Sequence, residues 1–126
     1  PELHEINVGQ WEGMDWSTIS RQMPEAYQRF MNDSGNNGYL GGESYRDVLD
    51  RVLPVFQNLL SSNAGQHIAV VAHKAVNRSM LANLLELEMR QAKDLPPENC
   101  CINIIVASGT RMKLKTMNSA MHLETR

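Results

Sequence analysis

The segment Gln66-His67-Ile68-Ala69-Val70-Val71-Ala72-His73-Lys74-Ala75-Val76-Asn77-Arg78 changes character at His73. Residues 68–72 form a short apolar run rich in β-branched side chains, which predicts a strand covered on both faces. Residues 75–87 carry apolar side chains at helical spacing and predict a helix. In a doubly wound α/β sheet, ligands bind where a strand ends, and the next helix offers free N–H groups to an anion. The position of His73 therefore fits either a phosphate or carboxylate ligand, or a histidine that only ends the strand.

The composition indicates one globular domain. A chain of 126 residues can bury one core but is too short for two domains, so we expect a single domain over residues 1–126. The net charge of −2 gives no basic surface that would indicate nucleic acid or a membrane as a partner. Adjacent Cys100 and Cys101 suit neither a disulfide nor a zinc site, and the histidines lack metal-ligand spacing. With no apolar run of membrane length and no signal sequence, we expect a cytoplasmic protein without a metal ion.

The rest of the chain alternates helical and strand patterns, as α/β folds do. A polar loop should come first, and a long amphipathic helix should precede the segment that ends at His73. Two β-rich runs near the end, separated by Ser108-Gly109, predict a hairpin. The expected elements are a loop over 1–13, helices over 16–22, 24–33 and 44–60, and paired strands over 101–106 and 111–117.

Several short motifs occur in a fixed order along the chain. They are Leu3-x-Glu5-x-x-x-Gly9-x-Trp11-Glu12-Gly13, Gly42-Glu43-Ser44, Val71-Ala72-His73, Asn99, and the run from Asn118 to His122-Leu123. The ordered set resembles the histidine phosphatase superfamily, and most of all its phosphoglycerate-mutase-like phosphatases. The resemblance covers nearly the whole chain.

The resemblance implies an α/β fold with a mostly parallel sheet flanked by helices. It also implies a phosphatase or phosphomutase that needs no metal or other cofactor and acts on a small phosphorylated metabolite. Members of the family form a phosphohistidine on a first histidine within an Arg-His-Gly motif, and no such tripeptide occurs here. We therefore expect the chain to match the last two thirds of a family domain, incomplete at the N-terminus, and to be inactive alone.

Two residues match catalytic positions of the family. Glu5 matches the general acid/base that protonates the leaving oxygen and later activates water. Its apolar neighbours could raise the pKa of such a carboxyl group, although a solvated loop carboxylate is the alternative. His73 matches the second active-site histidine, which binds the phosphoryl group and stabilises its charge without being the nucleophile.

Four further residues are candidates for substrate binding. Glu43 and Ser44 match a pair that borders the family's pocket, although Ser44 equally suits the cap of the long helix. Trp11 could line the substrate entrance or simply pack within the fold. Lys74 occupies a position where the family usually has glycine, so its ammonium group either turns into the crevice or points to solvent.

Two classes of function fit these observations. The first is a phosphoryl-transfer enzyme whose nucleophile lies in residues upstream of Pro1. The second is a non-catalytic α/β module that keeps the anion crevice for binding a ligand or a partner. In either case the strand over 68–72 would lack its usual neighbour, and the open edge could pair with a second copy of the chain.

Overall fold

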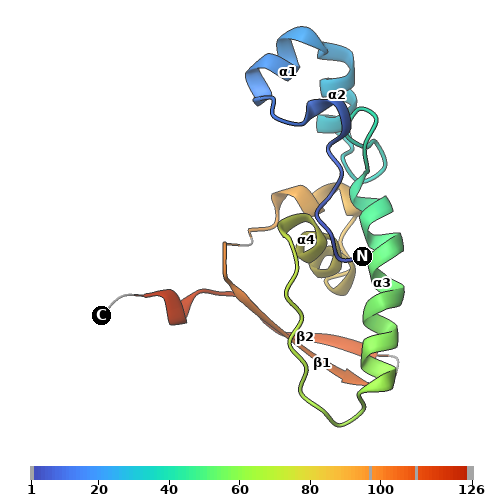
Figure 1. Cartoon of the computed structure of the whole chain (residues 1–126), viewed down its shortest axis with the longest axis vertical. Coiled ribbons are helices and arrows are strands. Elements are labelled where there is room, and N and C mark those ends of the chain that lie inside the picture. Colours follow the sequence, from blue (N-terminus) through green and yellow to red (C-terminus); the bar gives the residue numbers. More distant parts are fainter. Residues whose placement is uncertain (1, 97, 110, 125–126) are drawn as a thin grey trace.

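The computed structural model describes residues 2–96, 98–109 and 111–124. In Figure 1 the chain forms an elongated body, with the first two helices at one end of the long axis and the hairpin toward the other. The elements in chain order are η1 (Gly9–Trp11), α1 (Trp16–Gln22), α2 (Pro24–Asn32), α3 (Tyr45–Ser62), α4 (Lys74–Leu84), η2 (Met89–Asp94), β1 (Ile102–Ser108), β2 (Arg111–Ser119) and η3 (Met121–Leu123).

Local signals set the beginnings of the helices. Asp15 caps α1 by accepting a hydrogen bond from Thr18 N, and Pro24 occupies the first turn of α2. Ser44 caps α3 in a reciprocal arrangement with Asp47. The helices predicted over 16–22, 24–33 and 44–60 are confirmed within about two residues, the usual uncertainty of a helix end. The helix predicted over 75–87 is α4, which begins one residue earlier and ends at Leu84.

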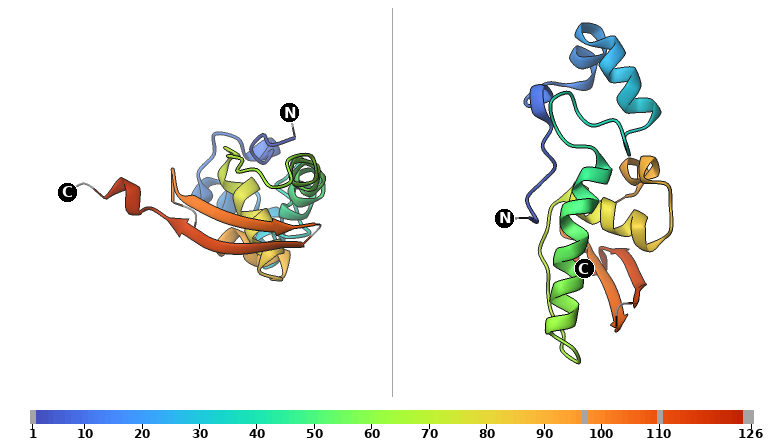
Figure 2. Two further views of the ribbon diagram at one scale, coloured as in Figure 1. Left: turned by 90° about the horizontal axis from the view of Figure 1, so that it is seen from below. Right: turned by 90° about the vertical axis from the view of Figure 1, so that its right-hand side faces the viewer.

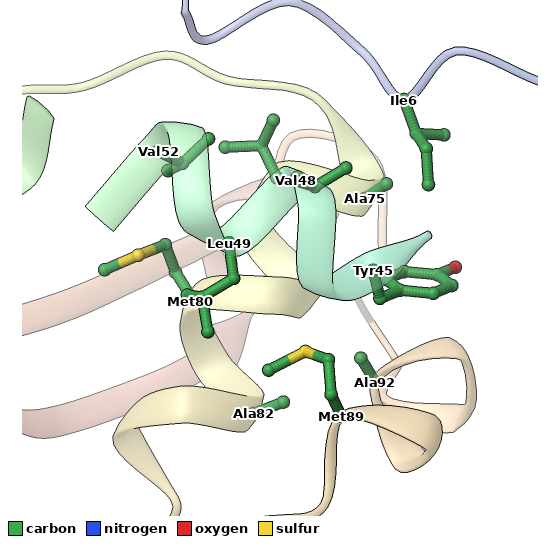
Figure 3. Close-up of a cluster of buried hydrophobic side chains, with 11 residues drawn as sticks. Ile6, Tyr45, Val48, Leu49, Val52, Ala75, Met80, Ala82, Met89 and Ala92 are labelled. Carbon is green, nitrogen blue, oxygen red and sulfur yellow. The ribbon is translucent and has the colours of Figure 1, made fainter. Parts of the chain in front are cut away.

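The main core lies where α3, α4 and η2 meet. Figure 3 shows side chains of α3 directed at α4 and η2, with Ile6 joining from the N-terminal segment. Val48, Val52 and Val76 are fully buried, and burial of such a side chain stabilises the fold by about 1.5–3 kcal/mol. This core fixes the amino end of α4 beside the N-terminal segment.

A second core holds the end of the molecule that contains α1 and α2. Its centre is formed by Trp11, Ile19 and Phe30, with Tyr39 packed against them. The Trp11 ring meets the rings of Phe30 and Tyr39 edge-on, at centroid distances of 5.6 and 5.7 Å. Aromatic packing thus joins η1 to α2.

The described residues contain one sheet, formed by β1 and β2 as an antiparallel pair. The predicted hairpin is therefore confirmed, with Ser108 opposite Arg111 at its turn. Side chains alternate along both strands between half-buried and exposed. Ile102, Ile104 and Val106 lie on the exposed face of β1, which is an unusual setting for large apolar side chains.

The strand predicted over 68–72 is not formed in this structure. Figure 1 shows the chain between α3 and α4 as a long irregular segment, and none of its residues pairs with another described segment. The expectation of burial on both faces is wrong, because Ile68 is exposed and the Val71 side chain is 93% exposed. A strand requires a partner for its N–H and C=O groups, and the apolar run alone supplies none.

In the right-hand view of Figure 2 this segment runs on one side of α3 and the hairpin lies on the other, and the only paired strands of the described residues are β1 and β2. A mostly parallel sheet is consequently not built by the described residues among themselves. The segment over 68–72 is unpaired among the described residues but does not form the strand edge expected from the sequence, and its pairing with a second copy remains a prediction.

Candidate active site

The Glu5 carboxylate lies at the amino end of α4, although the two are 70 positions apart in sequence. Its Oε1 accepts hydrogen bonds from the backbone N–H of Ala75 at 3.1 Å and of Ile6 at 2.9 Å. The first N–H groups of a helix have no acceptor within the helix, and its positive end stabilises a carboxylate. Oε2 accepts no hydrogen bond from the described residues. Oε1 therefore anchors the side chain to the start of α4.

His73 lies at the same end of α4 and is the N-cap residue of this helix. Its backbone is extended, with φ −86° and ψ 170°. Its carbonyl oxygen accepts the N–H of Asn77 at 3.0 Å, so its backbone begins the helix. The imidazole makes no capping hydrogen bond and is exposed. The fold thus brings Glu5 and His73 to one helix end and leaves the ring of His73 accessible.

Lys74 is the first residue of α4, and its side chain is exposed. Among residues 2–96, 98–109 and 111–124, no carboxylate pairs with its ammonium group. A cation at this helix end is opposed by the helix dipole, so solvent is the favourable place for it.

Glu43 and Ser44 have different surroundings although they are adjacent. Ser44 is almost fully buried, and its hydroxyl accepts the Asp47 N–H at 3.1 Å and donates to Asp47 Oδ2 at 2.7 Å. Its contacts are those of a helix cap. Glu43 forms an ion pair with Arg51, from Arg51 Nε to Glu43 Oε1 at 2.7 Å, and its Oε2 accepts the N–H of Asn7 at 2.8 Å.

The ionisation of Glu43 reflects these contacts. Partial burial would raise the pKa of its carboxyl group, but hydrogen bonds from Arg51 and Asn7 and the nearby positive charge lower the pKa below its ordinary value. Glu43 is therefore an anion at neutral pH that is already neutralised by protein groups. It borders the segment that carries Glu5.

Trp11 is only 3% exposed and lies inside the second core. The packing alternative describes its position, and its indole Nε1 has no hydrogen-bond acceptor among the described residues. A role at a substrate entrance would require this ring to leave its aromatic neighbours.

Sequence reasoning missed a group of polar side chains around Glu5. Burial raises the pKa of the Tyr39 and Tyr45 hydroxyls, the charge of Glu5 raises it further, and Arg78 opposes the shift. Both phenols therefore stay protonated and remain able to donate hydrogen bonds. Arg78 projects from α4, and its Nε donates to the carbonyl oxygen of Leu95, just after η2, at 2.8 Å. The helical spacing of Tyr45 indicates only an apolar role, so its polar role could not be predicted from the sequence.

Two open hollows on the surface lie away from this helix end. One, of about 400 Å³, lies between α2 and η2, and the other, of about 350 Å³, lies between the loop after α2, the start of α3 and η2; Glu88 and Arg90 line both. Neither is lined by Glu5 or His73. No group of three or more His, Cys, Asp or Glu side chains in the described ranges is arranged to hold a metal ion. No helix within these ranges is long and apolar enough to cross a membrane.

The sequence of the chain matches a known family. Residues 1–120 match the model of the histidine phosphatase superfamily (branch 1), and the chain belongs to this superfamily. The resemblance stated from the sequence motifs is thereby confirmed.

Curated relatives of the chain include phosphatases of this family. The 6-phosphofructo-2-kinase/fructose-2,6-bisphosphatase of Arabidopsis thaliana is 33% identical over 104 residues, which are 82% of this chain and 13% of that protein. Phosphoserine phosphatase 1 of Hydrogenobacter thermophilus is 25% identical over 119 residues, which are 94% of this chain and 56% of that enzyme.

Solved structures confirm the phosphoglycerate-mutase-like α/β fold class. YhfR of Bacillus stearothermophilus superposes with a TM-score of 0.87 at 23% identity, over 98% of this chain and 61% of that one. A phosphoserine phosphatase of Entamoeba histolytica gives 0.80 at 24% identity, over 98% and 62% of the two chains. The chain therefore spans less than two thirds of the length of these relatives.

Proposed function

We propose that the protein is a phosphoryl-transfer enzyme of the histidine phosphatase type that hydrolyses or moves a phosphate on a small metabolite. The observation that carries the proposal is the hydrogen bond from Ala75 N to Glu5 Oε1, at 3.1 Å. It joins the proposed acid/base to the helix end that begins at His73. Two chemically complementary groups, a carboxylate and an imidazole, thus flank backbone N–H groups suited to an anion.

In the proposed reaction, Glu5 and His73 have separate roles. Glu5, in its protonated form, gives its proton to the leaving oxygen while the phosphoryl group passes to a histidine nitrogen. As a carboxylate, it then takes a proton from the water that attacks the phosphohistidine, which releases phosphate and restores the acid. His73 and the amino end of α4 hold the phosphoryl oxygens and offset their negative charge. Tyr39 and Tyr45 would keep the surroundings of Glu5 polar.

The nucleophilic histidine is proposed to come from residues outside the present 126. No Arg-His-Gly tripeptide occurs in the chain. The coding sequence upstream of Pro1 is the discriminating observation. A strand followed by Arg-His-Gly there would support the enzyme, whereas a start codon directly before Pro1 would support a non-catalytic module.

The second candidate is that non-catalytic module, which would bind an anion or a partner without chemistry. It is favoured by Lys74, since the family usually has glycine at that position. Under the enzyme proposal the ligand is a small phosphorylated metabolite, and we propose that Glu43 and Ser44 border its pocket. Phosphatase and mutase activities use the same groups and differ in whether water or a second substrate hydroxyl accepts the phosphoryl group.

Hydrolysis of p-nitrophenyl phosphate tests the proposal. The 126-residue chain should show no activity above background, because phosphoryl transfer by this route needs the absent nucleophile. With the upstream segment restored, activity should appear and fall by about 100-fold or more in Glu5→Gln. Glu12→Gln, a matched change in an exposed carboxylate of the same segment, should leave it unchanged. Activity of the chain alone that is lost in His73→Ala would refute this assignment.

A further inference from the structure

The side chain of Arg51 is tied to the segment that carries Glu5. It projects from α3 and is 16% exposed. Its Nη2 donates to the carbonyl oxygens of His4 at 3.1 Å and Glu5 at 3.4 Å, and its Nη1 donates to that of Glu2. These three carbonyls belong to four consecutive residues. One guanidinium therefore fixes the backbone from which the Glu5 side chain projects.

The same guanidinium holds Glu43 through two hydrogen bonds, from Nε to Oε1 at 2.7 Å and from Nη2 to Oε2 at 3.1 Å. Paired contacts of this kind fix orientation as well as distance. Glu43 in turn accepts the N–H of Asn7 on Oε2, and its own N–H donates to the carbonyl of Asn7, both at 2.8 Å. The backbone around Glu5 is thus held at two points. Arg51 donates to the carbonyl oxygen of Glu5, and Glu43 binds Asn7, which follows two residues later.

The backbone between these contacts leaves little room for adjustment. A Cβ atom on Gly42 would lie 2.2 Å from the carbonyl oxygen of Asn7, and one on Gly9 would lie 2.3 Å from that of Leu40. Such close approach is possible only with glycine at both positions. The segment over 7–10 is therefore seated on the loop over 40–43, and this seating includes Glu43.

An ordinary stabilising ion pair would not need this distribution of acceptors. Every hydrogen-bond acceptor of Arg51 in the described structure is either Glu43 or a carbonyl of residues 2–5. The Arg51 and Glu43 side chains are only 16% and 20% exposed, and the cost of removing both charges from water offsets much of their attraction, so the main effect of the pair is on geometry. The contact from Glu5 Oε1 to Ala75 N spans 70 positions and depends on the placement of this segment.

We propose that Arg51, acting with Glu43, is a positioning residue that holds the Glu5 carboxylate against the amino end of α4. This inference rests on the proposed function, which gives Glu5 its role in proton transfer. The hydrogen bonds of the Arg51 side chain go to Glu43 and to the backbone of residues 2–5, so its proposed effect is exerted through Glu5. Loss of the Arg51 side chain would leave Glu5 present but wrongly oriented, and a misplaced catalytic group lowers the reaction rate.

Backbone NMR of the 126-residue chain tests the inference without relying on catalysis. In a pH titration the Ala75 amide resonance should respond to the charge of Glu5, because that N–H donates to the Glu5 carboxylate. The response should be lost in Arg51→Met and reduced in Arg51→Lys, whose ammonium group cannot reproduce the paired contact. Arg46→Met removes an exposed arginine from the same helix and should keep the full response.

Two further variants keep the outcome decisive. Glu5→Gln must abolish the Ala75 response, since a remaining response would show that Ala75 senses another group and would overturn the inference. Glu43→Gln should weaken the response while the amides of Val48 and Val76 in the core stay unchanged. A full response in Arg51→Met, or collapse of the whole spectrum in both Arg51→Met and Glu43→Gln, would also overturn it. Normal phosphatase activity of Glu5→Gln would instead refute the proposed function and leave the NMR result standing.

Discussion

Replacing Ser44 with alanine tests whether this residue caps α3 or binds substrate. The change removes two hydrogen bonds, from Asp47 N to Ser44 Oγ at 3.1 Å and from Ser44 Oγ to Asp47 Oδ2 at 2.7 Å. The hydrogen bond from Ser44 N to Asp47 Oδ2 at 2.8 Å remains. Loss of a serine cap costs about 0.5–2 kcal/mol. Because Ser44 is 2% exposed and water cannot easily replace its hydroxyl, we expect the upper half of that range, about 1–2 kcal/mol.

Urea denaturation of the chain measures this cost. With a slope of about 1–1.5 kcal/mol per molar urea, the unfolding midpoint should fall by about 1 M, and the slope should not change. Ser62→Ala, at the exposed last position of the same helix, is the matched control and should change stability by less than about 0.5 kcal/mol. Equal effects of the two changes would refute the capping argument. Weaker binding of orthophosphate by Ser44→Ala without loss of stability would favour the pocket interpretation.

Three further predictions concern the charge of Glu43, the orientation of Lys74 and the open edge. The pKa of Glu43 is lowered in the folded protein, so its stabilising contribution is complete above the ordinary value of 4.5 and is lost as pH falls through the lowered pKa. Urea denaturation at several pH values should therefore show a steeper acid loss in the wild type than in Glu43→Gln, and parallel curves would contradict this. Lys74→Gly should bind orthophosphate as the wild type does in an NMR titration, since this side chain is exposed, and binding weaker by about threefold or more would place the ammonium group at the ligand. The chain should associate in sedimentation experiments through the unpaired segment, and Val71→Lys should weaken the association; a monomer at every concentration would refute that expectation.

The sequence alone determined the features that depend on neighbouring residues. The caps at Asp15 and Ser44, the proline at the start of α2 and the hairpin are each set within a few positions. Their physical basis is local, because cap and turn hydrogen bonds join residues two to four apart. The ordered motifs likewise sufficed for the family, which the match over residues 1–120 confirmed.

Tertiary structure decided everything that depends on contacts between distant segments. The run over 68–72 has strand composition, but its backbone finds no partner among the described residues, so Val71 is exposed where burial was expected. Trp11 is buried by aromatic rings that lie up to 28 positions away, and no local pattern distinguishes that position from a surface one. A glutamate before the cap and an arginine two turns into the helix were the only signals of the Glu43–Arg51 pair. Its hold on residues 2–5 could not be predicted, because those hydrogen bonds span 46 to 49 positions and exist only once α3 and the N-terminal segment have packed.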